Sequence, residues 1–150
     1  MMTDLPATLA DIDALEEVMT RPTPALEAAL ASLDGDILVA GAGGKMSPTL
    51  CRLAKRAAPA KRVIAVARFS DPALPERLNA HGVETVACDL LDRDAVAALP
   101  DAANVVYMAG RKFGSVGAEH LTWAMNALAP AIVAERFKSA RIVALSTGCV

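Results

Sequence analysis

Two short stretches hold the residue types that could do chemistry. The first is GAGGKMS, residues 41–47, which follows the apolar run DILVA. Bare glycines let the backbone approach a phosphate closely, and a helix beginning there offers free N–H groups and a positive dipole end. The second is STGCV, residues 146–150, where the hydroxyls of Ser146 and Thr147 follow the apolar run RIVAL. The first stretch predicts a phosphate-binding loop, and the second places two hydroxyls at the end of an apolar strand.

The spacing of the glycines separates three kinds of phosphate loop. A Walker loop needs an earlier glycine and a Ser or Thr after the lysine, and the chain has neither, which excludes it. The dinucleotide spacing GxGxxG fits Gly41 and Gly43 but has Met46 at its third position. The spacing GxxGxxG fits Gly41 and Gly44 but has Ser47 there. The glycines alone therefore leave the last two patterns open.

The elements around these stretches alternate along the chain. The apolar runs DILVA, RVIAVA, VETVA, NVVYMA and RIVAL are separated by four segments of helical character. Continuous apolar strands between helices predict a parallel sheet covered on both faces. Right-handed crossovers then favour an α/β, Rossmann-type doubly wound sheet of order 3-2-1-4-5, with ligands at the carboxyl ends of the strands.

Residues 1–35 lack the alternation of apolar strands and helices that follows them. We interpret residues 1–35 as a helical extension and residues 36–150 as a dinucleotide-binding domain. Thr8 could cap the first of two appended helices, which we expect to pack on the domain through apolar rows. The rows are Ile12, Leu15 and Met19 in the first helix, and Leu26, Leu30 and Leu33 in the second.

Composition excludes several function classes. A formal charge of −2 gives no overall attraction to nucleic acid or an anionic membrane, and neither is predicted as a partner. The three cysteines form no CxxC pair and neither histidine has a ligand nearby in sequence, so no metal site is predicted. With no leader and no apolar stretch of about 20 residues, we expect a cytoplasmic protein. The cations Arg52, Lys55, Arg56, Lys61 and Arg62 are interpreted as water-facing charges at a helix end.

The sequence resembles the extended short-chain dehydrogenase/reductase superfamily, specifically its NAD-dependent epimerase/dehydratase group. The resemblance rests on GAGGKMS, CDLLD, YMAG, Asn126 and STGCV, which occur in the family's order. Ser47 departs from the family's third glycine, but its side chain is small. The resemblance implies that Gly41, Gly44, Lys45 and Met46 line the pyrophosphate, that Asp89 and Leu90 flank the adenine, and that Ala109 and Gly110 lie along the cofactor beyond it.

The end of the second predicted strand bears on the choice of cofactor. An NAD enzyme of this fold places a carboxylate there to bind the ribose hydroxyls. This chain has Ala67 followed by Arg68, and an arginine fork suits a 2′-phosphate. We therefore expect NADP to be preferred over NAD, although Asp71 could also reach the ribose.

The resemblance also implies a Tyr-x-x-x-Lys acid/base pair, with a strand-end hydroxyl at Thr147 and Ser146 beside it. The one tyrosine, Tyr107, is followed four residues later by Arg111, so we interpret it as a packing residue. We expect the chain to be the amino-terminal part of a longer protein, truncated after the fifth strand. Such a piece should bind a dinucleotide weakly, aggregate through its edge strand and turn over nothing.

Asn126 lies in the long fourth helical segment, where the resemblance implies support of a proton relay. Pro130 lacks an N–H and crowds the carbonyl of Asn126, so a bend that frees this carbonyl is predicted. We expect the complete protein to be an NAD(P)-dependent epimerase, dehydratase or reductase, with a small substrate such as a nucleotide sugar and a homodimer left open. The alternative is a non-catalytic NAD(P)-sensing module.

Overall fold

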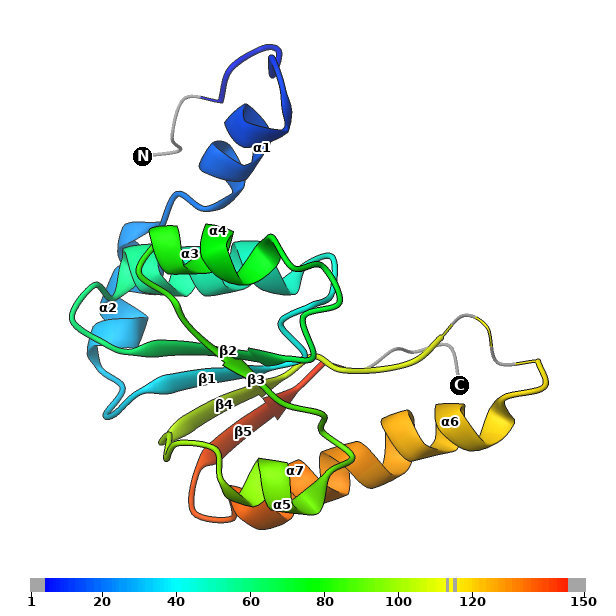
Figure 1. Ribbon diagram of the computed structural model, residues 1–150. Helices are drawn as coiled ribbons and strands as arrows, with labels where there is room; N and C mark the ends of the chain where they lie inside the picture. The colour runs from blue at the N-terminus through cyan, green and yellow to red at the C-terminus, as the bar shows by residue number, and fades with distance from the viewer. Residues whose placement is uncertain (1–4, 113, 115, 146–150) are drawn as a thin grey trace.

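A five-stranded parallel sheet forms the centre of the computed structural model, which describes residues 5–112, 114 and 116–145 (Figure 1). Its order, β3-β2-β1-β4-β5, confirms the predicted doubly wound topology. Ala40 at the end of β1 lies opposite Val66 of β2 and Tyr107 of β4, so neighbouring strands end level with one another. The strands are β1 (Ile37–Ala40), β2 (Val63–Ala67), β3 (Glu84–Ala87), β4 (Asn104–Tyr107) and β5 (Arg141–Ala144).

Helices cover both faces of the sheet (Figure 1). α3 (Ser47–Ala57) and α4 (Leu74–Ala80) cover one face, where Val39 of β1 packs in a cluster with Cys51. α5 (Arg93–Ala97) and α7 (Ala129–Arg136) cover the other, where Leu38 packs in a cluster with Val133. Because successive strand residues point to opposite faces and both faces are covered, β1 and β2 are buried throughout.

β5 lies at the edge of the sheet, as the predicted order requires. Among the described residues it pairs with β4 alone. Val143 and Leu145 leave 53% and 49% of their surface exposed. This strand therefore presents unpaired backbone groups beside apolar side chains, the combination that favours association.

Two helices, α1 (Ile12–Met19) and α2 (Pro24–Ala31), precede the sheet. The prediction that Thr8 caps the first was wrong, because Asp11 accepts the N–H of Ala14 instead. The predicted packing row of α1 was also wrong. Its residues face solvent, with Ile12 71% and Met19 54% exposed.

The opposite, charged side of α1 attaches it to α3. Glu17 accepts hydrogen bonds from Arg52 at 2.7 Å and from Arg56 at 2.9 and 3.0 Å. Arg56 also donates to the hydroxyl of Thr20, which is buried. Lys61 donates to two backbone carbonyls just before β1. The interpretation as water-facing charges was therefore wrong for Arg52, Arg56 and Lys61, which hold the N-terminal extension. The Arg62 side chain, by contrast, is 52% exposed.

The fourth helical segment is interrupted where Pro130 predicts a bend. It consists of α6 (Glu119–Trp123), the π-helix η1 (Ala124–Leu128) and then α7. The N–H of Ala129 donates to the carbonyl of Ala124, five residues earlier. A wider π turn relieves the clash that a proline ring makes with the carbonyl four residues before it. The break in α-helical geometry is thus present, and the use of the Asn126 carbonyl in a relay stays a prediction.

Candidate functional site

The glycine loop turns sharply between β1 and α3. Gly41 has φ +94°, and a Cβ placed on it would lie 2.5 Å from the backbone nitrogen of Ala109. Only glycine allows the ends of β1 and β4 to approach so closely. Ser47, at the place of the third glycine, is buried and donates from Oγ to the carbonyl of Gly41 at 2.9 Å. The serine therefore closes the loop, and no side chain caps the helix that starts there.

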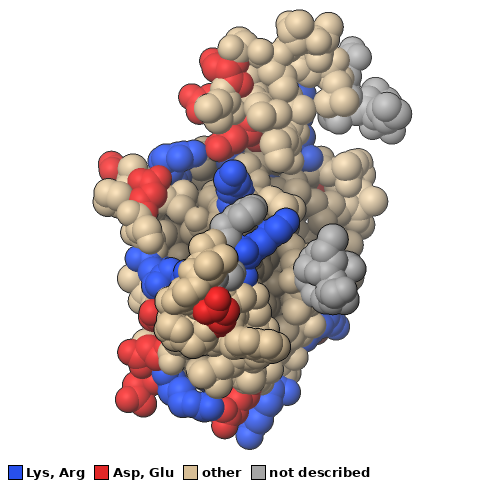
Figure 2. Space-filling view, turned by 90° about the vertical axis from the view of Figure 1, so that its right-hand side faces the viewer, with Lys and Arg blue, Asp and Glu red and all other residues tan. Residues whose placement is uncertain are grey.

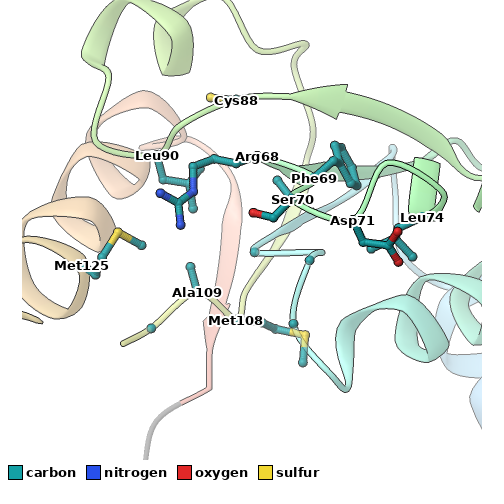
Figure 3. Close-up of a pocket in the computed structure, with 15 residues that line it drawn as sticks. Arg68, Phe69, Ser70, Asp71, Leu74, Cys88, Leu90, Met108, Ala109 and Met125 are labelled. Atoms are coloured by element: carbon teal, nitrogen blue, oxygen red, sulfur yellow. The ribbon is translucent and has the colours of Figure 1, made fainter. Parts of the chain in front are cut away.

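A cavity of about 280 Å³ lies at the carboxyl ends of the strands (Figure 3). The glycine loop forms one wall, and the residues that follow β2, β3 and β4 form the others. Gly43 and Gly44 present no side chain to it, so the backbone itself borders the space. Six predicted cofactor residues line it, namely Gly41, Gly44, Arg68, Leu90, Ala109 and Gly110.

Three other predicted residues do not line the cavity. Lys45 and Met46 are exposed on the loop beside it, with 68% of Met46 in solvent. Asp89 follows β3, but its carboxylate accepts the N–H of Leu91 at 3.0 Å and shapes the turn. The structure therefore places these three around the cavity rather than in its wall.

The segment after β2 brings polar groups to the cavity. The guanidinium of Arg68 reaches in toward Leu90, and the hydroxyl of Ser70 points in from the same segment (Figure 3). Phe69, between them, has φ +50°, an uncommon conformation for a residue with a side chain. Asp71 also lines the cavity, and one of its carboxylate oxygens accepts the N–H of Ala73 at 3.0 Å, just before α4. Arg68 and Asp71 therefore both border the cavity, and the carboxylate in addition closes a turn.

Asn126 is joined to the segment after β4. Its Oδ1 accepts the N–H of Arg111 at 2.8 Å, and its Nδ2 donates to the carbonyl of Arg111 at 2.9 Å. Gly110 comes just before this clamp, and a Cβ on it would lie 3.5 Å from Oδ1 of Asn126. The side chain of Asn126 therefore fixes the course of the chain at the end of the cavity wall.

The predicted hydroxyls Ser146 and Thr147 lie outside the described residues. The structure does describe Tyr107, which is buried and donates from its hydroxyl to the carbonyl of Met125 at 3.3 Å. Burial raises the pKa of Tyr107 to about 12. The interpretation of Tyr107 as a packing residue is confirmed, since its proton is held and hard to remove.

The sequence interpretation missed several residues of the cavity wall. Met108 and Met125 contribute apolar, polarizable surface, as does Cys88. Burial, followed by the charges of Asp89 and Asp92, raises the pKa of Cys88, so its thiol is a poor nucleophile. Cys88 and Met108 are the first residues after β3 and β4, a position that could have identified them.

The described residues contain no group of three His, Cys, Asp or Glu side chains able to hold a metal ion. Within the same ranges, no helix has the length and apolar character needed to cross a membrane.

The model of the NAD dependent epimerase/dehydratase family matches residues 37–150. The chain belongs to this family. No curated protein sequence matches it. The match begins at the first residue of β1, so α1 and α2 lie outside it.

Solved structures of epimerases share the fold of this family member. A UDP-glucose-4-epimerase from Stenotrophomonas maltophila, solved with NAD and formylated UDP-arabinopyranose, is 21% identical with a TM-score of 0.65, over 78% of this chain and 38% of that one. An epimerase from Methanothermobacter thermautotrophicus is 23% identical with a TM-score of 0.69, over 84% and 39%. The ADP-L-glycero-D-manno-heptose-6-epimerase of Helicobacter pylori is 17% identical with a TM-score of 0.65, over 77% and 40%. The chain thus spans about two fifths of the length of these structures.

Proposed function

We propose that this chain is the dinucleotide-binding part of an NAD(P)-dependent epimerase, dehydratase or reductase. One observation carries the proposal: the glycine loop after β1 and the segments that follow β2, β3 and β4 line one cavity. Family membership supports it, as does the NAD in the Stenotrophomonas epimerase. The bare backbone at Gly43 and Gly44 fits a pyrophosphate, with Lys45 and Met46 beside it on the loop. A bound nicotinamide would supply hydride transfer, and the chain would orient it.

Within this proposal, one end of the cavity binds the adenine half of the cofactor and the other end binds the nicotinamide half. Leu90 and Asp89 would flank the adenine, and Ala109 and Gly110 would lie along the other half. Arg68 would bind the 2′-phosphate of NADP, which is why we favour NADP over NAD. The position of its guanidinium in the cavity supports this.

For the complete protein we propose a nucleotide sugar as substrate, which the UDP- and ADP-sugar chemistry of the similar epimerases supports. Thr147 and Ser146 would hold the substrate oxygen, and Asn126 would support the proton relay. We also propose a cytoplasmic homodimer of the complete protein. Exposed Trp123 and Leu128 on the α6–η1 segment support such a contact.

A non-catalytic NAD(P)-sensing module is the second candidate. Within the residues given, the one tyrosine is buried and hydrogen-bonded in the core, so it offers no acid/base group to the cavity. A turnover assay separates the candidates in the complete protein: hydride transfer to or from a nucleotide sugar supports the enzyme, and binding without turnover supports the sensor.

Calorimetric titration of the purified chain with NADP⁺ and NAD⁺ tests the binding proposal. A Cβ on Gly43 meets one atom within 4 Å, the Cβ of Ala67 at 3.5 Å, so Gly43→Leu should fold and fill the cavity. We expect this variant to weaken NADP⁺ binding at least about tenfold, equal to 1.4 kcal/mol. Ala28→Leu, on the exposed surface of α2, is the control that should bind like the wild type. Equal affinity of the two variants would refute the proposed site.

A further inference from the structure

The part of the cavity wall that follows β4, residues 108–110, is held at both ends by the π-helical turn η1. Just before this segment, the hydroxyl of Tyr107 donates to the carbonyl of Met125 at 3.3 Å. Just after it, the N–H of Arg111 donates to Oδ1 of Asn126 at 2.8 Å, and Nδ2 of Asn126 donates to the carbonyl of Arg111 at 2.9 Å. Two consecutive residues of η1 therefore fix the two ends of the wall.

The π register makes the first of these contacts possible. In an α-helix the N–H of Ala129 would donate to the carbonyl of Met125. Here it donates to the carbonyl of Ala124, five residues earlier. The next donor that a π turn could offer to Met125 is Pro130, which has no N–H. The carbonyl of Met125 is thus available to the hydroxyl of Tyr107, which donates to it.

The same register sets the direction of the side chains on η1. Met125 lines the cavity, and its side chain reaches in on the side of Ala109 (Figure 3). Return to an α-helical register would turn the residues before the break by about 100° about the helix axis and shift them by about 1.5 Å. Met125 would then leave the cavity, and Asn126 would leave the backbone of Arg111.

Pro130 opposes this return. Its ring would clash with the carbonyl of Asn126 in a regular α-helix. α7 itself is anchored, because Ile132 and Val133 are buried in the core, so a change of register would move η1 and α6. We propose that Pro130 is a positioning residue of the cavity, which keeps η1 in the register that holds residues 108–110 in place for the cofactor. This proposal rests on the proposed function of the cavity.

The affinity for NADP⁺ is a suitable measure of the wall's position. Figure 2 looks onto the carboxyl ends of the strands, where Lys and Arg side chains gather near the middle and would attract the phosphates of a dinucleotide. The ligand would lie between the glycine loop and residues 108–110, which border the same cavity. A wall that is held in advance costs less to order on binding, so loosening it should weaken binding.

The test compares Pro130→Ala with the wild type in the purified chain. Alanine is a better helix former than proline, so the variant should unfold at an equal or higher urea concentration. Hydrogen exchange of the Arg111 amide, followed by nuclear magnetic resonance, should become at least about tenfold faster, because its acceptor moves away. Calorimetric titration should show NADP⁺ binding weakened about fivefold or more. Pro24→Ala is the matched control, since Pro24 also lies at the start of a helix, α2, and it should alter neither the exchange nor the affinity.

Several results would overturn the assignment. A lower urea midpoint together with weaker binding would make Pro130 an ordinary packing residue. Unchanged exchange at Arg111, or faster exchange with unchanged NADP⁺ affinity, would also contradict it. Asn126→Ala removes the amide and keeps the proline, so it should speed exchange at Arg111 as well, and slow exchange there would show that the clamp does not hold the wall. If the wild type binds no dinucleotide, the proposed function fails by itself, and the exchange at Arg111 still decides whether Pro130 positions the wall.

Discussion

Replacing Gly41 by alanine should destabilise the fold far more than the same change at Gly44. A Cβ on Gly41 would lie 2.5, 2.7 and 2.9 Å from the N, Cα and Cβ atoms of Ala109, and most of these belong to backbone that cannot move aside. The residue also has φ +94°, which alanine adopts at a cost of about 1–2 kcal/mol. Relief of the overlap costs a further 1–3 kcal/mol or so. The expected loss is about 2–5 kcal/mol, a large part of a typical domain's stability.

Gly44→Ala is the control for this comparison. A Cβ there meets the hydroxyl of Ser47 at 3.4 Å and the carbonyl of Gly41 at 3.6 Å, which are near-normal contacts. Its free energy of unfolding should change by less than about 1 kcal/mol in either direction. Urea unfolding followed by circular dichroism measures both variants. Equal stabilities of the two would show that the close approach of β1 to the segment after β4 does not exist.

Arg68→Gln should lower the preference for NADP⁺ over NAD⁺ about tenfold in titrations, while Arg93→Gln on α5 leaves it unchanged; an unaltered ratio in both would remove Arg68 from the site. Glu17→Gln should lower the midpoint of thermal unfolding at pH 7. The hydrogen bond from Arg56 lowers the pKa of Glu17 below its ordinary 4.5, so its stabilisation is complete above pH 4.5 and is lost as the pH falls through the lowered pKa. The difference from wild type should therefore vanish in acid, and a difference that persists at pH 2 would contradict the ion pair. Burial raises the pKa of Cys51 to about 12, so maleimide at pH 8 should label it only in urea, as peptide mass spectrometry can show; rapid native labelling would mean that the helix–sheet core opens.

The sheet and the glycine loop could be predicted because their signals are local. Five apolar runs between helical segments sufficed for the strand order, since a strand buried on both faces needs apolar residues throughout. The break at η1 was also indicated locally, by Pro130, but its π geometry was not. A proline excludes an α-helical bond without determining which wider turn replaces it.

The attachment of α1 could not be predicted, because it depends on partners far apart in the sequence. Glu17 meets Arg52 and Arg56 across 35 and 39 residues. An amphipathic helix ordinarily buries its apolar row, but here the charged side of α1 meets α3. The role of Asp71 could not be predicted for a similar reason. The sequence does not distinguish a carboxylate that binds a ribose from one that accepts a backbone N–H in a turn, as Asp71 does with Ala73.

The most direct test of the account is the position of a bound dinucleotide on the chain. Amide chemical shifts of the ¹⁵N-labelled protein, followed during titration with NADP⁺, report it residue by residue. We predict the largest shifts at residues 41–47, 67–70, 88–90 and 109–111, which border the cavity. Shifts confined to residues 136–140, in the hollow at the other end of the sheet, or the absence of any shift in a folded sample, would contradict the assignment of this cavity to a nicotinamide dinucleotide.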